Sequence, residues 1–181
     1  MMTREAFVVR HTAPEIQTRV ADLAGRLGPS HQDHGLLVVG VLKGTTMLLA
    51  DLVRQLSCPV RFEFIDVERV DQSDPAGEPR IAIRFMTRFQ VTDQDVLLLK
   101  DVVTTGVVES YLLSQLRAQS PRSLQLACVV DRRPARRVSL EVDHPLFVEP
   151  EAELWVGYGL DAGLGRFAQL PDLAVLVDAN A

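Results

Sequence analysis

Apolar and polar residues follow two different periods along the chain, and each change of period marks a new element. Apolar residues recur at helical spacing from Pro14 to Leu27, and Gly28-Pro29 is expected to end that helix. The short run from Leu36 to Leu42 is continuously apolar, which predicts a strand buried on both faces. A helical pattern over Thr45–Leu56 follows it directly. A strand between two helices is therefore expected in the first third of the chain.

The middle of the chain predicts a hairpin and then a strand, a helix and a strand. Val60–Val67 and Arg80–Phe85 alternate between apolar and polar residues, and the polar stretch Glu68–Pro79 between them is expected to be a loop. The elements expected after the hairpin are a strand over Val96–Val103, a helix over Val107–Gln119 and a strand over Leu124–Val130. This alternation predicts an α/β fold with a mainly parallel sheet and helices on both of its faces.

Two strand ends in this scheme carry residues suited to a ligand. In parallel α/β sheets ligands bind beyond the carboxyl ends of the strands, which here means Lys43-Gly44 and the segment from Asp101 to Gly106. The second is an acidic residue and a Thr-Thr-Gly turn that opens a helix. Backbone N–H groups and a helix N-terminus then point at one spot, which suits a phosphate. Alone, the pattern fits an ordinary structural turn equally well.

Composition narrows the class of protein. At 181 residues and 20.1 kDa the chain fits one domain, and its net charge of −5 gives no footprint for nucleic acid or a membrane surface. No stretch reaches the ~20 apolar residues of a membrane span, and the N-terminus lacks a signal-peptide pattern, so the cytoplasm is expected. Cys58 and Cys128 lie far apart in apolar surroundings, which favours buried thiols over a disulfide or a metal pair.

Blocks of residues along nearly the whole chain resemble the hypoxanthine-guanine phosphoribosyltransferase family. The blocks are Val41–Gly44, Leu49–Val53, Val96–Gly106, Val129–Pro134, Val156–Asp161, Arg166 and Leu170-Pro171. They keep the family's order and approximate spacing from about Glu15 to Val177. The resemblance implies the type I phosphoribosyltransferase fold, a three-layer mainly parallel sheet flanked by helices, with a small hood and a mobile β-hairpin loop. One domain over residues 1–181 is expected, with a core at about 15–135 and a hood from the N-terminal segment and about 136–181.

The resemblance also implies an activity and a set of ligands. It implies transfer of a phosphoribosyl group from phosphoribosyl diphosphate (PRPP) to a 6-oxopurine, a purine-salvage reaction that uses Mg²⁺. PRPP, the purine and a nucleoside monophosphate would be the ligands of such an enzyme. A homodimer or homotetramer is implied as well, and neither nucleic acid nor a membrane is expected as a partner.

Five positions carry the implied diphosphate, ribose and metal contacts. Lys43 matches the family's diphosphate-site lysine, between Leu42 and Gly44, and a cis peptide bond is expected between Leu42 and Lys43. Asp101 matches the second acid of the pair that holds the ribose hydroxyls, partly through Mg²⁺. Asp161 matches the acid that holds a second Mg²⁺ through its water shell.

The remaining positions concern the purine and the phosphates. Arg132 or Arg133 stands where a family lysine contacts the 6-oxo group, and an arginine is a bulkier donor. Leu154 replaces the aromatic residue that stacks on the purine, with Trp155 next to it; Trp155 also fits an ordinary core aromatic. Arg166 matches the arginine near the diphosphate, one residue out of register. The backbone amides expected to hold the 5′-phosphate are those of Thr105, Gly106, Val107 and Val108.

The family pattern breaks at three positions of the phosphate loop. Members read Glu-Asp-x-x-Asp-Thr-Gly-x-Thr, whereas this chain reads Lys100-Asp101-Val102-Val103-Thr104-Thr105-Gly106-Val107-Val108. Lys100 reverses a charge beside the sugar, and Val108 removes a hydroxyl that would bind the phosphate. Thr104 replaces the acid proposed as general base for the purine N7 proton, a loss that typically costs ~10²–10⁴-fold in rate.

These substitutions leave two hypotheses, an enzyme with an altered site or a catalytically impaired binding protein for a purine nucleotide or PRPP-like ligand. The stretch Val67–Asp71 lacks the family's Ser-Tyr pair, and the acidic segment from Asp66 to Glu78 either repels a diphosphate or is simply a solvated loop. The only two lysines, Lys43 and Lys100, fall at the two candidate strand ends. Lys100 either pairs with Asp101 or a ligand phosphate, or is an ordinary exposed lysine.

Overall fold

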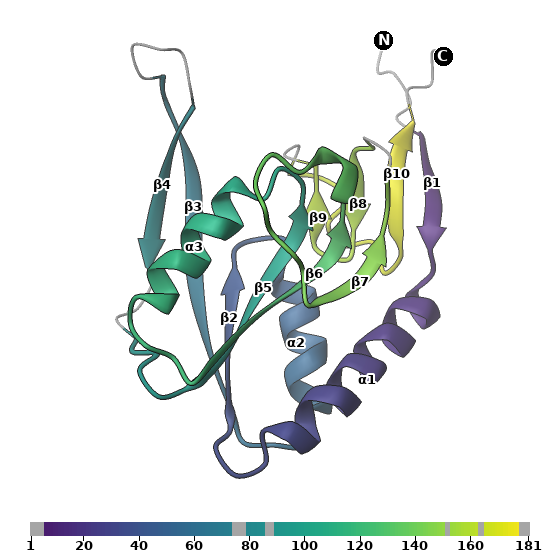
Figure 1. Ribbon diagram of the computed structural model, residues 1–181. Coiled ribbons are helices and arrows are strands. Elements are labelled where there is room, and N and C mark those ends of the chain that lie inside the picture. Colours follow the sequence, from purple (N-terminus) through teal and green to yellow (C-terminus); the bar gives the residue numbers. More distant parts are fainter. Residues whose placement is uncertain (1–5, 74–78, 86–88, 151–152, 163–164, 178–181) are drawn as a thin grey trace.

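The computed structural model describes residues 6–73, 79–85, 89–150, 153–162 and 165–177, which form two β-sheets flanked by helices (Figure 1). The larger sheet has the strand order β4-β3-β2-β5-β6-β7, and all neighbours except β3 and β4 run parallel. Its strands are β2 Leu36–Val41, β3 Val60–Ser73, β4 Pro79–Phe85, β5 Asp95–Val103, β6 Ser123–Asp131 and β7 His144–Val148. The mainly parallel sheet predicted from the sequence is confirmed.

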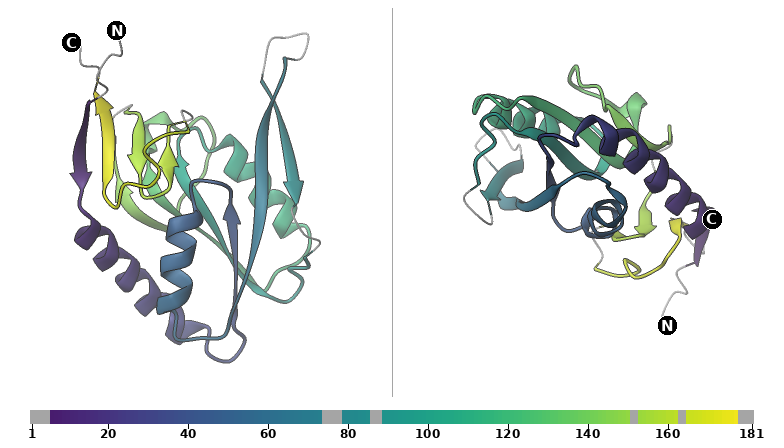
Figure 2. Two further views of the ribbon diagram at one scale, coloured as in Figure 1. Left: turned by 180° about the vertical axis from the view of Figure 1, so that it is seen from behind. Right: turned by 90° about the horizontal axis from the view of Figure 1, so that it is seen from below.

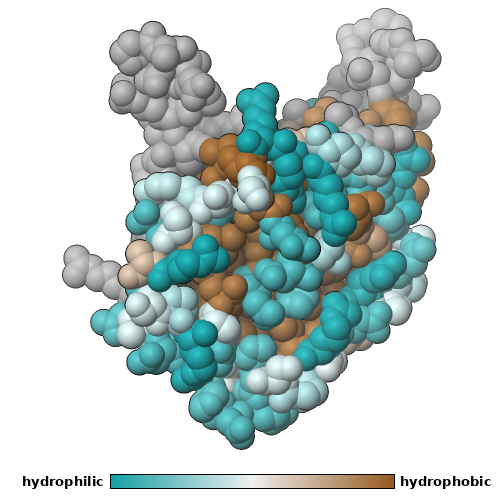
Figure 3. Space-filling view, in the orientation of Figure 1, coloured by the Kyte–Doolittle hydropathy of each residue, from teal (hydrophilic) through white to brown (hydrophobic). Residues whose placement is uncertain are grey.

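Helices cover both faces of this sheet (Figures 1 and 2). The helices are α1 Ala13–Ser30, α2 Thr46–Gln55, α3 Val107–Arg117 and the short 3₁₀ helix η1 Arg133–Ala135. One apolar cluster joins α1 and α2 to the sheet, and a second joins α3 to the opposite face, which gives the predicted three layers. On the face seen in Figure 3, hydrophobic residues gather in the middle and hydrophilic ones surround them. No helix within the described ranges is long and apolar enough to cross a membrane.

Strand β2 shows why a continuous apolar run was needed. All six of its residues are buried. Leu36 and Val38 belong to the cluster with α1 and α2, whereas Leu37 and Val39 belong to the cluster with α3. Successive side chains of a strand point to opposite faces, so a strand covered on both faces must be apolar throughout.

A second, four-stranded antiparallel sheet lies at the carboxyl end of the central strands (Figure 1). Its strands are β1 Ala6–His11, β8 Trp155–Gly157, β9 Leu160–Asp161 and β10 Leu173–Val177, in the order β1-β10-β8-β9. Trp155, Tyr158 and Leu173 share an apolar cluster with α1 and α2, which favours the proposed single domain. The central sheet extends past the core boundary expected at about 135, because β7 pairs with β6.

Two element boundaries differ from the sequence-based predictions. Helix α1 continues through Gly28-Pro29 to Ser30 instead of ending there, and a tight bond from His31 N to Gly28 O (3.2 Å) closes its last turn. Pro29 is the last residue but one of the helix, so its missing N–H removes only one hydrogen bond of the last turn. Gly28 packs closely on Ser57, where an added Cβ would lie 3.2 Å from the Ser57 nitrogen.

Strand β3 is also longer than predicted. It runs to Ser73, through half of the expected loop Glu68–Pro79, because the antiparallel ladder with β4 continues to the pair Ser73–Pro79. Backbone pairing of this kind does not depend on side-chain polarity, which had indicated a loop. The expected mobile tip at 74–78 lies outside the described residues.

We predict that Asp95 anchors the start of β5. Its carboxylate, on an 8% exposed residue, accepts hydrogen bonds from Ser123 Oγ (2.6 Å) and Arg122 Nη1 (2.9 Å). Burial alone would raise the pKa of Asp95, but these two bonds hold it below its ordinary value. Asp95→Ala should therefore destabilise the fold by about 1–3 kcal/mol at neutral pH, measured by urea unfolding.

The pH dependence follows from the lowered pKa. The contribution is present above the unfolded-state pKa and disappears as the pH falls through the folded-state pKa, so the difference between Asp95→Ala and the unmodified protein should shrink in acid. Asp22→Ala, on the exposed face of α1, serves as the control. An equal loss for both variants, or a loss that is constant with pH, would contradict the assignment.

Candidate active site

A cavity of about 460 Å³ opens where β2 and β5 end beneath the second sheet. The residues that line it are Leu42, Lys43, Gly44, Asp66, Val67, Asp101, Val102, Glu153, Leu154, Trp155, Gly159, Leu160, Asp161 and Ala162. Four carboxylates face one basic side chain in this described lining. Of the residues predicted from the sequence, the structure brings together Leu42, Lys43, Gly44, Asp101, Leu154, Trp155 and Asp161.

The turn after β2 forms one wall of the cavity. The peptide bond between Leu42 and Lys43 is cis, as predicted, and Lys43 is exposed. Thr45 is fully buried, and its Oγ1 donates to Val41 O (2.7 Å), which holds the turn onto β2. A side chain at Gly44 would place its Cβ 2.7 Å from Asp101 Cβ. Only glycine therefore allows the two strand ends to approach this closely.

Asp101 is held at the end of β5 by its neighbours. Its Oδ1 accepts hydrogen bonds from Val102 N (2.8 Å) and from Lys100 Nζ. The side chains of Lys100 and Asp101 are 18% and 25% exposed, so the pair is largely shielded from water. Burial alone would lower the pKa of Lys100, but the charge and the hydrogen bond of Asp101 outweigh it and raise that pKa. Lys100 is thus a charged partner of Asp101, one of the two alternatives considered for it.

Glu109 adds a second carboxylate behind this pair. It lies in the first turn of α3 and is only 4% exposed. Burial raises the pKa of Glu109, and the nearby Lys100 ammonium partly opposes that shift. The carboxyl group of Glu109 is therefore buried near Lys100.

The predicted phosphate loop opens α3 as expected, at Val107. Gly106 has φ of 79°, and an added Cβ there would lie 3.0–3.2 Å from Leu140, Val138 and Arg136. Along β5 and the loop that follows it, Val102 is the last residue in the described lining of the cavity. The loop therefore lies beside the cavity.

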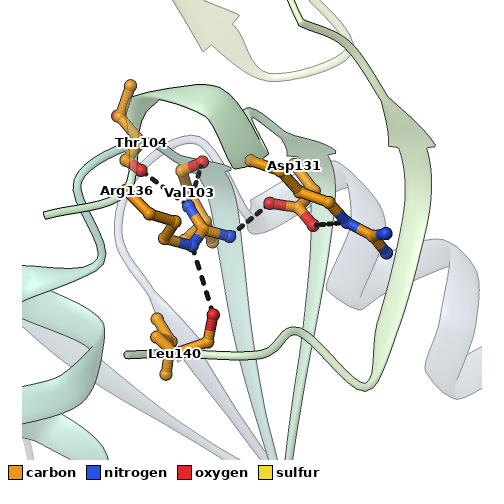
Figure 4. A network of polar contacts seen from close by, with 6 residues as sticks. Val103, Thr104, Asp131, Arg136 and Leu140 are labelled. Carbon is orange, nitrogen blue, oxygen red and sulfur yellow. Dashed lines mark hydrogen bonds and ion pairs between the residues drawn. The ribbon is translucent and has the colours of Figure 1, made fainter. Parts of the chain in front are cut away.

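Three consecutive carbonyls of this loop are tied to the segment 132–137, and Figure 4 shows the two that Arg136 binds. Arg136 Nη1 donates to Val103 O (2.9 Å) and Thr104 O (2.6 Å), and Arg137 N donates to Thr105 O (2.9 Å). In a trans peptide unit the N–H points opposite to the C=O. The N–H groups of Thr105 and Gly106 therefore point away from segment 132–137.

Asp131 holds Arg136 in the position from which it binds the loop carbonyls. Its side chain is 1% exposed and pairs with Arg136 Nη2 and with Arg133 Nε (3.1 Å). Arg136 Nε also donates to Leu140 O (3.4 Å). The Arg136 guanidinium is therefore turned into the protein, where four internal acceptors occupy it.

Arg132 remains the better candidate for a purine contact. Arg133 is exposed and engaged by Asp131, whereas Arg132 Nε is buried and has no hydrogen-bond partner among the described residues. A buried donor without a partner favours a ligand or water opposite it. Arg132 is not part of the described cavity lining, so its contact with the 6-oxo group stays a prediction.

The part of the cavity where a purine contact is predicted combines an exposed and a buried residue. Leu154 is 58% exposed and Trp155 is 3% exposed, and Trp155 Nε1 has no partner among the described residues. The His11 ring lies 6.2 Å from the Trp155 ring and stacks on Phe147 at 3.7 Å. Trp155 is therefore a core aromatic that also lines the cavity, and His11 is the last residue of β1.

The last two predicted residues differ in position. Asp161 lines the cavity, whereas Arg166 is exposed, lies outside the described lining, and has its guanidinium 5.9 Å from the Phe167 ring. Within the described ranges, no three His, Cys, Asp or Glu residues are grouped to hold a metal ion. Asp161 fits a water-mediated Mg²⁺ contact, but the ammonium on Asp101 Oδ1 does not fit a metal ligated by that oxygen.

Comparisons with known proteins identify the class. Residues 11–161 match the family model of the phosphoribosyl transferase domain, so the chain is a member of that class. It is 31% identical to the hypoxanthine-guanine phosphoribosyltransferase of Bacillus subtilis over 180 residues, which cover 99% of this chain and 98% of that protein. The corresponding protein of Mycobacterium avium is 32% identical over 156 residues, 83% of this chain and 76% of that one.

Structural similarity leads to the same family. The structure resembles a solved hypoxanthine phosphoribosyltransferase of Trypanosoma cruzi with a TM-score of 0.84 and 30% identity, covering 98% of this chain and 94% of that one. The chain belongs to the hypoxanthine-guanine phosphoribosyltransferase family. The family and the fold class predicted from the sequence are both confirmed.

The contacts of Asp131 predict unequal roles for its two arginines. Arg136→Ala removes the buried partner and should destabilise the protein by about 3–5 kcal/mol, because Asp131 is left underpaired and the loop carbonyls lose their donor. Arg133→Ala removes an arginine whose side chain is 61% exposed and should cost less than about 1 kcal/mol. Chemical unfolding of both variants measures the difference, and equal losses would refute it.

Glu109 predicts a specific pH dependence. Because its folded-state pKa is raised above the unfolded value, its ionisation weakens the fold as the pH rises from about the unfolded pKa through the folded one. Glu109→Gln should therefore gain stability relative to the unmodified protein at neutral pH and lose that advantage in acid. The exposed Glu141→Gln is the matched control, for which no pH-dependent difference is expected in thermal melts.

Proposed function

We propose that this protein transfers a phosphoribosyl group from PRPP to N9 of a 6-oxopurine, releasing diphosphate, as a purine-salvage enzyme of the cytoplasm. The observation that carries the proposal is the meeting of the Lys43 turn and Asp101 in one cavity, with Gly44 almost touching Asp101. Near-full-length similarity to proteins named hypoxanthine-guanine phosphoribosyltransferase supports the same reaction.

Each end of the cavity would hold a different part of the substrates. Lys43 would stabilise the leaving diphosphate, and Asp101 would accept hydrogen bonds from the ribose hydroxyls. The outward N–H groups of Thr105 and Gly106 would hold the 5′-phosphate, as expected for a turn that opens a helix. Asp161 would hold Mg²⁺ through water, and the ion would supply positive charge for the diphosphate.

The purine would lie at the side of the cavity formed by the second sheet. Leu154 and Trp155 line that side, and Arg132 would donate to the 6-oxo group. Leu154 gives an apolar contact but no ring to stack on, so binding of the base is expected to be weak. The exposed guanidinium of Arg166 would reach the diphosphate only if its turn moves toward the cavity.

The proton on purine N7 has no carboxylate acceptor at the position of Thr104. When the bond from N9 to C1′ forms and the bond from C1′ to the diphosphate oxygen breaks, that proton would leave to water. A threonine hydroxyl does not accept it at neutral pH, so the reaction should be slow.

A diphosphate-release assay tests the proposal. With PRPP, Mg²⁺ and hypoxanthine, guanine, xanthine or adenine in turn, slow release is expected for the 6-oxopurines. Release should be lost in Lys43→Ala and in Asp101→Ala, and should rise roughly 10²–10⁴-fold in Thr104→Asp, which restores a general base. No release in the unmodified protein and in Thr104→Asp would reject the enzyme.

The residues at which this chain departs from the family pattern favour a second function. That function is binding of a purine nucleotide by a catalytically impaired member of the family. Thr104 and the ion pair of Lys100 with Asp101 are the observations behind it. A nucleoside monophosphate would then raise the melting temperature, whereas PRPP with Mg²⁺ would not. A homodimer or homotetramer is proposed for either function, and sedimentation would measure it.

A further inference from the structure

The cation next to Asp101 is part of the chain itself. Lys100 Nζ lies on Asp101 Oδ1, and the same oxygen also accepts the backbone N–H of Val102 (2.8 Å). Both hydrogen bonds that described residues make to this carboxylate end on Oδ1. A divalent cation ligated by that oxygen would have to displace the ammonium of Lys100. Because Lys100 is the neighbour of Asp101 in the chain, that ammonium always stays close by. Lys100 therefore competes with any metal ion at this position.

The surroundings of Lys100 make the ammonium necessary to the fold. Its side chain is largely buried and pairs with Asp101 at the cavity, and its charge also acts on the buried Glu109 in the first turn of α3. Cys128, opposite Lys100 on β6, is fully buried. Buried carboxylates are costly unless a cation or hydrogen-bond donors accompany them.

The other charges near this group do not replace the ammonium. Lys43 is exposed and forms no ion pair with Asp101 among the described residues, and Arg136 is occupied by Asp131 and by loop carbonyls. Among the described residues in contact with Asp101, Lys100 is the only cation. Lys100 thus serves both as a neutralising charge and as a fixed hydrogen-bond donor to Oδ1.

We infer that Lys100 takes the place of a divalent cation at Asp101, so that this half of the site needs no metal. The proposal concerns the pocket of the proposed function but does not depend on the transfer reaction. It predicts that Asp101 becomes a metal site only when Lys100 is removed. Lys100 is a positioning residue, because it acts through the carboxylate of Asp101.

Metal-dependent melting of the ligand-free protein tests this inference. Lys100→Met keeps the length of the side chain but removes its charge. Its melting temperature should fall by roughly 5–10 °C, because two buried carboxylates lose their cation. Millimolar Mg²⁺ or Mn²⁺ should restore about half of that fall by binding to the released carboxylate, whereas the unmodified protein should gain much less at equal ionic strength.

Three further variants identify the atom responsible. Lys100→Met with Asp101→Asn should show no metal response, because the carboxylate is gone. Lys100→Arg keeps the charge and should behave like the unmodified protein. Lys43→Met removes the chain's other lysine and should create no new metal response. If Lys100→Met fails to fold, recovery of folding in the double variant supports neutralisation of Asp101, and failure of both overturns it.

The inference fails if the unmodified protein gains as much from Mg²⁺ as Lys100→Met does. It also fails if Lys100→Met melts like the unmodified protein without any metal response. None of these measurements uses turnover, so an inactive protein would leave the result readable. Absence of diphosphate release rejects the enzyme, and only the melting experiments reject the role of Lys100.

Discussion

The buried ion pair between Asp131 and Arg136 is the constraint on which the site depends. Asp131 ends β6 inside the protein, and its charge can be tolerated there only with a cation against it. Arg136 meets that need, and its remaining donors then reach the carbonyls of Val103 and Thr104 at the end of β5. One electrostatic requirement at the end of one strand therefore sets the backbone direction at the end of its neighbour.

A second charge problem is solved next to the first in a different way. Glu109 is buried and Asp101 is partly exposed at the cavity, and Lys100 pairs with Asp101 while its charge also acts on Glu109. Asp131 is paired with an arginine and Asp101 with a lysine. The planar guanidinium of Arg136 has several donors and binds several acceptors around Asp131, whereas the compact ammonium of Lys100 neutralises the carboxylate of Asp101. Each of the two neighbouring strand ends thus carries its own ion pair.

Sequence patterns predicted what is periodic or local, and missed what depends on distant partners. The apolar run of β2 and the helical period of α2 identified those elements, because burial on two faces or on one imposes such patterns. Strands β8 and β9 are only three and two residues long, too short to show a period. The extension of β3 depends on β4, whose pairing the local polarity of the strand does not reveal.

The candidate site shows the same division. Lys43 and Asp101 could be predicted because strand ends can be read from the sequence. The role of Arg136 could not, because its acceptors are backbone carbonyls some thirty positions earlier in the chain. Lys100 was left with two alternatives, since its neighbour Asp101 is adjacent in sequence but Glu109 reaches it only through the packing of α3. Trp155 proved to be both core and lining, which one pattern cannot distinguish.

The second sheet has a consequence for how the cavity is assembled. Its edge strand β1 precedes every other element, yet β1 pairs only with β10, which follows all of them. During synthesis the central sheet can form while β1 still lacks its partner, with Phe7, Val8 and Val9 unpaired along the backbone. The cover of the cavity is then the last part to form, so an incomplete chain presents strand ends open to solvent.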